Sequence, residues 1–335
     1  MGCKVVTDSN IRVLQTVRAP KETTNPFISL LFRGLGLEGV RVVPFSWRQA
    51  IFGRYDVVHA HWPEYLLRNR NSAVRTAQTI LFATWLARLK FSRIPAVMTV
   101  HNIKPHEPLN RTEERLLQAF SNRVQARAFM TKDSRASASD RIIPHGHYRD
   151  WYGEPTETAT PTSGKLLFFG ILRRYKGLES LLRAFNNQAN PTLTLHIIGR
   201  PVDSELAADV TRAAESNPRI RTVIAHIPDD ALAREIRSST LVVLPYRDLY
   251  NSGALLLALS LNTPVLVPQT ASTVALAQEV GMGWIHMFDG DLTSDHLSSA
   301  ALAPRPSEAP NLDQRSWSSI GREYVDLYKH VGRRD

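Results

Sequence analysis

Short, uninterrupted apolar segments recur through the second half of the chain, and each is followed by a segment with helical character. A strand that reads as a continuous apolar run is buried on both faces, whereas a half-exposed strand alternates apolar and polar residues. The pattern therefore predicts a parallel, doubly wound α/β sheet covered by helices. The six segments are LLFFG (166–170), LTLHIIG (193–199), IRTVIAH (220–226), TLVVLPY (240–246), TPVLVP (263–268) and GWIHMF (283–288).

The first half repeats this alternation, with the helices expected near 26–37, 73–90 and 111–121. Asn25 and Pro26 are a typical cap and first-turn pair for the first of these helices. A Pro, Thr, Gly and Ser-rich segment at 152–165 separates the halves and is typical of a domain boundary. We predict two Rossmann-like domains that face a central cleft, over 1–151 and 166–310. A last helix lies within 311–335, and packing back across the junction is one option for it. The strands expected in the first half are 12–18, 40–45, 55–61, 96–102, 127–131 and 141–146.

The composition excludes several classes of protein. Hydrophobic residues make up 43% of the chain, which argues against disorder. The single cysteine, Cys3, excludes a disulfide scaffold. The N-terminus lacks the apolar core of a signal peptide, and no run of about 18 apolar residues could span a bilayer. We therefore expect a soluble cytoplasmic protein.

The net charge of +10 is distributed unevenly. Residues 1–150 contain 23 basic and 11 acidic side chains, whereas 151–335 contain 18 and 20, so the positive excess belongs to the first half. No acidic residue occurs from Tyr65 to Arg93, where apolar residues recur at helical spacing. A basic, apolar helix is typical of a surface that rests on an anionic membrane. The residues assigned to this membrane and acceptor surface are Arg68, Arg70, Arg75, Trp85, Arg88, Lys90 and Arg93.

The basic first half is compatible with two further kinds of protein surface. The same helix could pack on a sheet and leave its arginines in solvent. A nucleic-acid-binding protein would also be basic, but the sequence shows no known nucleic-acid module, and we expect no nucleic-acid partner. The expected location is therefore the inner face of the plasma membrane, as a peripheral protein.

Two segments of the second half could bind a diphosphate. The turn 170–177 places Arg173 and Lys176 beside the start of a helix, where backbone N–H groups and cations attract anions. The segment 245–253 follows a buried strand and opens the next helix, which offers a second anion site or a plain helix cap. The residues assigned to donor binding are Arg173, Lys176, Gly199, Arg200, Tyr246, Asn251, Ser252 and Gly253.

These motifs carry a resemblance to a known family. The sequence G-x-L-R-x-Y-K-G at 170–177, the strand that ends in LPY, and NSGALLLALSLNTPV resemble the donor domain of GT-B glycosyltransferases, closest to the family 4-like group. The resemblance implies that Arg173 and Lys176 neutralise the diphosphate of a nucleotide-sugar. Leu249 and Leu257 stand where that family usually has two glutamates, one of which holds the ribose. The NSG version is similar to bacterial exopolysaccharide β-mannosyltransferases that use GDP-mannose and a lipid-linked acceptor.

The first half supplies polar residues where its predicted strands end. The resemblance implies that His101 contacts the donor sugar. If configuration inverts, a base must take the proton of the acceptor hydroxyl; the candidates are Glu107, which we favour, Glu64 and His61. A retaining reaction would need no such base, and the sequence leaves the two outcomes open.

We predict an enzyme that needs neither metal nor cofactor. We expect His59 and His61 to point to opposite faces of their strand and not to share a metal ion. Asp289 and Asp291 imitate a D-x-D metal motif, but we expect a surface loop there. The predicted function is transfer of a hexose, with mannose favoured, from a nucleotide-sugar to a glycolipid or polysaccharide precursor. A nucleotide-sugar epimerase of the same fold is the alternative enzyme.

Overall fold

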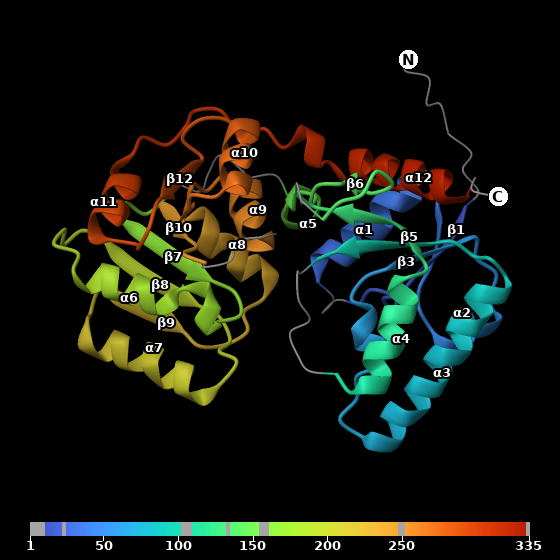
Figure 1. Ribbon diagram of the computed structural model, residues 1–335. Helices are drawn as coiled ribbons and strands as arrows, with labels where there is room; N and C mark the ends of the chain where they lie inside the picture. The colour runs from blue at the N-terminus through green and yellow to red at the C-terminus, as the bar shows by residue number, and fades with distance from the viewer. Residues whose placement is uncertain are drawn as a thin grey trace, which may run out of the picture. The chain divides into compact units, whose positions relative to one another are not determined.

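The computed structural model describes residues 11–21, 25–101, 109–131, 135–153, 161–246 and 252–332. The chain forms two compact units (Figure 1). Unit 1 comprises Met1–Gly146 and Gln314–Asp335, and unit 2 comprises His147–Asp313.

Unit 1 is built on a six-stranded sheet of order β2-β1-β3-β4-β5-β6 in which every neighbouring pair is parallel. Parallel neighbours require crossovers, and helices supply those from β1 to β5, whereas the described residues between β5 and β6 form no helix. The strands are β1 (Arg12–Gln15), β2 (Arg41–Val43), β3 (Val57–Ala60), β4 (Ala96–Val100), β5 (Val124–Phe129) and β6 (Arg141–Ile142).

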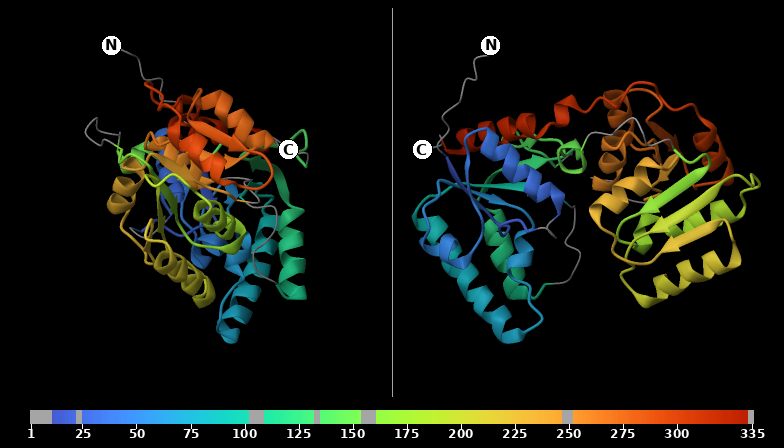
Figure 2. Two further views of the ribbon diagram at one scale, coloured as in Figure 1. Left: turned by 90° about the vertical axis from the view of Figure 1, so that its left-hand side faces the viewer. Right: turned by 180° about the vertical axis from the view of Figure 1, so that it is seen from behind.

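Helices cover both faces of this sheet. Helices α1 and α12 lie on one face and α2, α3 and α4 on the other (Figures 1 and 2). The predicted cap of α1 is confirmed, since the Phe27 amide donates to Asn25 Oδ1 at 3.0 Å and Pro26 opens the helix. The helices of this unit are α1 (Pro26–Leu37), α2 (Trp47–Phe52), η1 (Pro63–Leu66), α3 (Ser72–Phe91), α4 (Arg111–Ser121) and α12 (Trp317–Gly332).

The last helix, α12, belongs to unit 1 although it follows unit 2 in the chain. It packs on α1 through glycines: a Cβ built on Gly321 would lie 2.5 Å from the carbonyl oxygen of Gly34. Its buried face contains Trp317, Tyr324 and Tyr328, which reach the core beneath α1. A segment remote in sequence therefore completes the first sheet's covering layer.

Unit 2 repeats the architecture on a parallel sheet of order β12-β11-β10-β7-β8-β9. The predicted fold class, two doubly wound parallel sheets, is confirmed. The strands are β7 (Lys165–Phe169), β8 (Thr194–Ile198), β9 (Ile220–Val223), β10 (Leu241–Val243), β11 (Val265–Pro268) and β12 (Ile285–Phe288). The helices are α5 (Arg149–Tyr152), η2 (Arg174–Lys176), α6 (Leu178–Asn186), α7 (Ser204–Ser216), α8 (Asp229–Arg237), α9 (Gly253–Ser260), α10 (Ala271–Val280) and α11 (Ser294–Leu302). The short helix η3 (Asp313–Arg315) spans the return of the chain to unit 1.

The units divide at Gly146, five residues before the predicted end of the first domain. The division falls before α5 because α5 and the residue after it are hydrogen-bonded to α8 of unit 2. The Trp151 indole donates to Asp229 at 2.7 Å, and Arg237 donates to the carbonyls of Tyr152 and Gly153. Most of the expected linker, 154–160, lies outside the described residues.

Candidate functional site

Polar side chains gather at the carboxyl edge of the unit 1 sheet, where ligands bind in open parallel sheets. Gln15 ends β1, His59 and His61 lie at the end of β3, and Thr99 and His101 lie at the end of β4. Strands β1, β3 and β4 are neighbours in the sheet, so these side chains come within hydrogen-bonding distance of one another.

His61 stands at the centre of this group. Its Nε2 lies 3.0 Å from Gln15 Oε1, and its Nδ1 lies 2.9 Å from His101 Nε2. Its backbone is held as well, because the Thr16 hydroxyl accepts from the His61 amide and donates to the His61 carbonyl. Both ring nitrogens of His61 therefore have protein partners, and the side chain is buried.

A second branch of the network leads to the last helix. His59 Nε2 lies 2.7 Å from Thr99 Oγ1, whose hydroxyl is 2.8 Å from the hydroxyl of Tyr324 on α12. His59 Nδ1 lies 2.7 Å from the Tyr328 hydroxyl and 3.4 Å from Gln15 Nε2. Gln15 thus joins the two branches, since its amide touches both His59 and His61.

The histidines of the network are neutral at physiological pH. Burial lowers the pKa of His61 to about 3. Burial also lowers the pKa values of His59 and His101 well below 6.5, and positive charge on neighbouring histidines would oppose their protonation further. A neutral imidazole has one donor and one acceptor nitrogen, so each contact above has a direction.

Trp62 packs directly on His101. The two rings are stacked with centroids 3.8 Å apart, and Trp62 has the left-handed backbone angles φ 45 and ψ 56. Non-glycine residues in this region carry strain of about 1–3 kcal/mol, which is common at functional sites. No sequence motif indicates a role for Trp62, although it lies directly between His61 and Pro63.

Of the four predicted catalytic residues of the first half, the structure describes His61, His101 and Glu64. His61 and His101 come together, and both ring nitrogens of His61 lie within hydrogen-bonding distance of protein side chains. Glu64 is half-buried on η1, directly after this cluster. Glu107 lies outside the described residues.

The expectation that His59 and His61 point to opposite faces is wrong. Residues two apart on a strand share a face, and the two rings lie with centroids 4.1 Å apart. Within the described residues, no group of three His, Cys, Asp or Glu side chains is arranged to hold a metal ion. Asp289 and Asp291 are exposed in a turn around Gly290, as a surface loop requires.

In unit 2, glycines bring the turns after three neighbouring strands together. A Cβ on Gly199 would lie 1.8 Å from the Gly170 carbonyl oxygen, and a Cβ on Gly177 would lie 2.0 Å from the Pro245 carbonyl oxygen. Only glycine permits both the positive φ and these approaches. The segments after β7, β8 and β10 therefore meet at one edge of the sheet.

Several predicted donor residues lie at that edge. The Lys176 ammonium is 5.2 Å from the centroid of the Tyr246 ring, and burial, then the charge of Arg173, lowers the Lys176 pKa to about 8. Within the described residues, the buried Tyr246 hydroxyl has no hydrogen-bond partner. Gly199 is buried and Arg200 is exposed beside it.

The start of α9 forms the other predicted anion site. Ser252 caps the helix by accepting from the Leu255 amide at 3.1 Å, and Gly253 is the first helical residue. The cap was one of the two interpretations of this segment, and it leaves the positive end of the helix dipole at Gly253. Asn251 lies outside the described residues.

Helix α3 is the basic helix of the first half. The side of α3 that contains Trp85 was expected to face a membrane, but it packs against the core of unit 1. Trp85 is fully buried between Phe45, Phe82 and Phe120, and its indole donates to the Tyr55 hydroxyl at 3.1 Å. The assignment of Trp85 to a membrane surface is therefore corrected.

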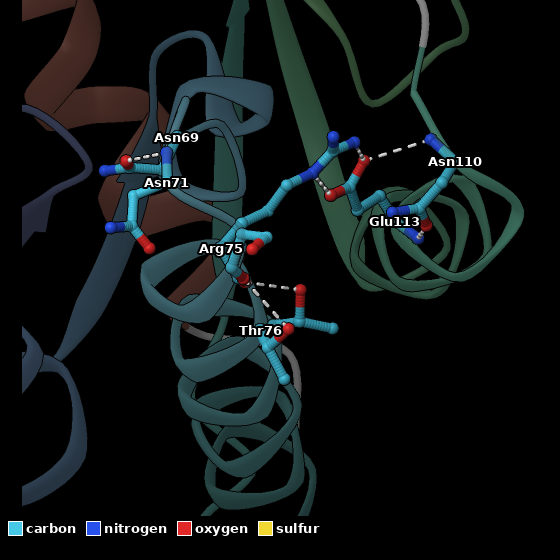
Figure 3. Close-up of polar contacts among 8 residues, drawn as sticks. Asn69, Asn71, Arg75, Thr76, Asn110 and Glu113 are labelled. Carbon is cyan, nitrogen blue, oxygen red and sulfur yellow. Dashed lines mark hydrogen bonds and ion pairs between the residues drawn. The ribbon is translucent and has the colours of Figure 1, made fainter.

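Two arginines of that assignment also have structural partners. Arg75 forms a two-pronged ion pair with the buried carboxylate of Glu113 on α4 (Figure 3). Arg88 donates to the carbonyls of Ala50 and Gly53, which ties α3 to α2. Arg70, Lys90 and Arg93 are exposed, and Arg68 lies over the Tyr65 ring. No helix in the described ranges is long and apolar enough to cross a membrane.

Comparison with known proteins gives consistent results. Residues 163–292 match the family described as "Glycosyl transferases group 1". A GDP-mannose:glycolipid 4-beta-D-mannosyltransferase of Xanthomonas campestris pv. campestris is 40% identical over 324 residues, which cover 95% of this chain and 92% of that enzyme.

Solved structures share the fold at low sequence identity. An α,α-trehalose-phosphate synthase of Burkholderia vietnamiensis aligns with a TM-score of 0.66 and 15% identity over 96% of this chain and 99% of its own. A glycosyltransferase involved in avilamycin A biosynthesis aligns with a TM-score of 0.63 and 14% identity over 97% and 99%. These likenesses show the GT-B fold.

Proposed function

Because the chain belongs to the group 1 glycosyltransferases, in one family with the Xanthomonas campestris mannosyltransferase, we propose that it transfers mannose from GDP-mannose to a glycolipid. The observation that supports this most is 40% identity across 95% of the chain, which includes both units. Family membership gives no support to an epimerase or to a nucleic-acid-binding protein. We further propose exopolysaccharide synthesis at the cytoplasmic face of the membrane as the setting.

The proposed reaction breaks the bond between the anomeric carbon and the β-phosphate oxygen of GDP-mannose and forms one to an acceptor hydroxyl. GDP-mannose is an α-glycoside, so a β-linked product, as named for the relative, requires inversion. Inversion calls for a base that takes the hydroxyl proton. Glu64 and Glu107 are the carboxylates proposed for this task, and the two single Gln variants would separate them.

The carboxyl edge of unit 2 supports the donor side of the proposal. The leaving diphosphate gains negative charge as the glycosidic bond breaks, and fixed cations stabilise that charge. We propose that these cations are Arg173, Lys176 and Arg200. The partial positive charge at the N-terminus of α9, at Ser252 and Gly253, would add to them. Tyr246 backs the Lys176 ammonium through its ring face. With cations in this role, we propose that transfer needs no metal ion.

The function is tested by incubating the protein with radiolabelled GDP-mannose and the glycolipid fraction of Xanthomonas campestris membranes. We expect label from GDP-mannose to enter the lipid phase. UDP-glucose is the control donor. Incorporation should be equal with and without EDTA, which removes metal ions. Lys176→Ala should abolish incorporation and leave the far-ultraviolet circular dichroism unchanged. Release of free mannose alone, without labelled lipid, would contradict the glycolipid acceptor.

The outward side of α3 supports peripheral membrane binding. The exposed stripe contains Ala73, Ala77, Ile80, Ala87 and Phe91, and Phe91 is 84% exposed. This helix has no acidic residue. Basic groups flank the stripe at Arg70, Lys90 and Arg93.

An uncharged face with basic ends complements the apolar interface and anionic headgroups of a bilayer. The stripe lies on the side of α3 opposite the buried Trp85. A single charged residue placed within it should therefore weaken membrane binding.

Sedimentation with vesicles of phosphatidylglycerol and phosphatidylethanolamine tests this surface. Ile80→Glu, at a site 62% exposed, should reduce the bound fraction, since a charge opposes insertion of an apolar face. Leu302→Glu, at a leucine 71% exposed in unit 2, is the matched control and should bind as the wild type does. Equal binding of all three proteins would remove α3 from the proposal.

A further inference from the structure

The hydroxyl of Tyr246 in unit 2 is buried without a hydrogen bond, unlike the hydroxyls of the buried tyrosines in unit 1. Tyr246 is 6% exposed, and no atom of the described ranges is hydrogen-bonded to its hydroxyl. In unit 1, the hydroxyls of Tyr55, Tyr324 and Tyr328 each lie within 2.8 Å of a protein partner. A buried polar group without a partner costs folding free energy, so proteins rarely retain one without a reason. The Tyr246 hydroxyl therefore indicates a partner that comes from outside the described chain.

Tyr246 lies at the carboxyl edge of the unit 2 sheet, beside the turn that contains Lys176. It follows β10, and its ring packs edge-on to Phe168 of β7, with centroids 6.5 Å apart. The residue before it, Pro245, has its carbonyl oxygen 2.0 Å from a Cβ built on Gly177, so the two segments touch. Ligands of open parallel sheets bind at this edge. The unpaired hydroxyl is thus placed where a ligand is expected.

The groups around this hydroxyl are cations and hydrogen-bond donors. The Lys176 ammonium lies 5.2 Å from the centroid of the Tyr246 ring. Burial, and then the charge of Arg173, lowers the pKa of Lys176, which places the guanidinium close to the ammonium. Burial raises the pKa of Tyr246 above its usual value, so the hydroxyl stays protonated and can donate. A ligand with several anionic oxygens, such as a diphosphate, complements such a set of groups.

We infer that the Tyr246 hydroxyl donates a hydrogen bond to a diphosphate oxygen of the bound nucleotide-sugar, next to the ammonium of Lys176. The identity of this ligand rests on the proposed glycosyltransferase function, whereas the unpaired hydroxyl does not. The ammonium of Lys176 lies over the ring on a flexible stem, so it can move aside as the anion enters. Tyr246 then has two separable functions: its ring supports the ammonium, and its hydroxyl binds the diphosphate.

This assignment predicts opposite effects of the hydroxyl on stability and on binding. Without a ligand, the hydroxyl has lost its water and gained no partner, so it destabilises the folded chain. With a diphosphate bound, it forms a charge-assisted hydrogen bond. Tyr246→Phe keeps the ring and removes only the hydroxyl, so it should relieve the first effect and abolish the second. A tyrosine with a purely structural hydrogen bond would lose stability in the same substitution.

Thermal unfolding of the full-length protein without nucleotide tests the first effect. The midpoint for Tyr246→Phe should stay at the wild-type value or rise by up to about 4 °C. Tyr55→Phe is the matched control, because its hydroxyl donates to the Ala50 carbonyl and accepts from the Trp85 indole. That variant should lower the midpoint by about 2–4 °C. An equal fall in both variants would show that the Tyr246 hydroxyl is already paired in the free protein, and it would overturn the inference.

Isothermal titration at pH 7 tests the second effect, with GDP, GDP-mannose and UDP as ligands. The Kd for GDP should rise about 10- to 100-fold in Tyr246→Phe, the range expected for the loss of a hydrogen bond to a charged group. Tyr55→Phe should bind GDP as the wild type does. An unchanged Kd for GDP in Tyr246→Phe would overturn the inference and leave the proposed function standing.

The nucleotide series locates the contact and separates this inference from the proposed function. GDP and GDP-mannose should lose affinity by the same factor in Tyr246→Phe, because both contain the diphosphate. A loss confined to GDP-mannose would place the contact on the sugar and overturn the inference. If the wild type binds UDP but not GDP, and Tyr246→Phe weakens UDP binding over the same range, the GDP-mannose function fails while the diphosphate contact stands. A wild type that binds none of the three ligands would overturn both.

Discussion

Gly34 on α1 faces the backbone of Trp317 on α12 so closely that a Cβ at residue 34 would lie 2.4 Å from the Trp317 carbonyl oxygen. Backbone cannot move aside as a flexible side chain can. The approach of the two helices therefore depends on the absence of a side chain at this position.

We expect Gly34→Ala to destabilise unit 1 by about 2–3 kcal/mol, because overpacking forces the helices apart. Gly36, two residues further along α1, has nothing within 4 Å of a built Cβ and is exposed. Gly36→Ala should therefore be neutral or stabilise by up to about 1 kcal/mol, since alanine is the better helix former. Urea unfolding of both variants measures the difference, and equal midpoints would contradict the close packing.

Local signals along the chain predicted the strands and several helix starts. Each strand of unit 2 overlaps a predicted apolar run, and only β7 begins one residue before its run, because burial on both faces leaves a continuous pattern that needs no knowledge of the partner. Asn25 and Pro26 predicted the start of α1 for the same reason: a cap is a local hydrogen bond. Helix α2, of six residues, is too short for a periodic signal and was not predicted.

The candidate site was only partly predictable. The carboxyl ends of parallel strands identified His61 and His101, since their sheet edge follows from topology alone. Tyr324 meets Thr99 across 225 residues of sequence, and no local pattern announces such a contact. On α3 the periodicity could not show that Trp85 belonged to the buried side, because the exposed residues Ala73, Ile80 and Phe91 are also uncharged.

The ion pair of Glu113 predicts a pH-dependent stability. Arg75, through its hydrogen bonds, lowers the Glu113 pKa below 4.5, so the folded state favours the carboxylate more than the unfolded state does. A carboxyl group with a depressed pKa stabilises the folded state at pH values above its pKa in the unfolded chain. This contribution to stability is lost as the pH falls through its pKa in the folded state.

We therefore expect Glu113→Gln to be less stable than the wild type at pH 7 and the gap to narrow below about pH 4.5. Thermal unfolding from pH 7 to pH 3 measures it. Glu114→Gln, next to it but exposed, is the control and should follow the wild type throughout. A stability difference between Glu113→Gln and the wild type that stays constant with pH would show that the shape of the side chain, and not its charge, causes the loss of stability.

The left-handed Trp62 predicts a difference between two truncations. Trp62→Ala and Trp62→Gly both remove the ring that stacks on His101, so both should slow mannosyl transfer. They differ in backbone strain, because glycine adopts φ 45 and ψ 56 without penalty and alanine does not. Trp62→Gly should be more stable than Trp62→Ala by about 1 kcal/mol. Equal stability in chemical denaturation would argue against strain at this residue.

Lys176 predicts a pH dependence of donor binding. Its pKa, lowered to about 8 by burial and by Arg173, means that the ammonium is mostly charged at pH 7 and mostly neutral at pH 9. If the charged form binds the diphosphate, the Kd for GDP should rise about tenfold between these pH values, as the charged fraction falls by that factor.

Isothermal titration with GDP measures this rise in matched variants. Lys176→Arg keeps its charge over the whole range and should flatten the pH dependence, because a guanidinium does not titrate there. Arg174→Ala removes a neighbouring cation that forms ion pairs with Glu179 and Glu205, and this variant should bind GDP with the wild-type pH profile. A profile in Lys176→Arg as steep as that of the wild type would assign the titration to another group and remove Lys176 from the diphosphate site.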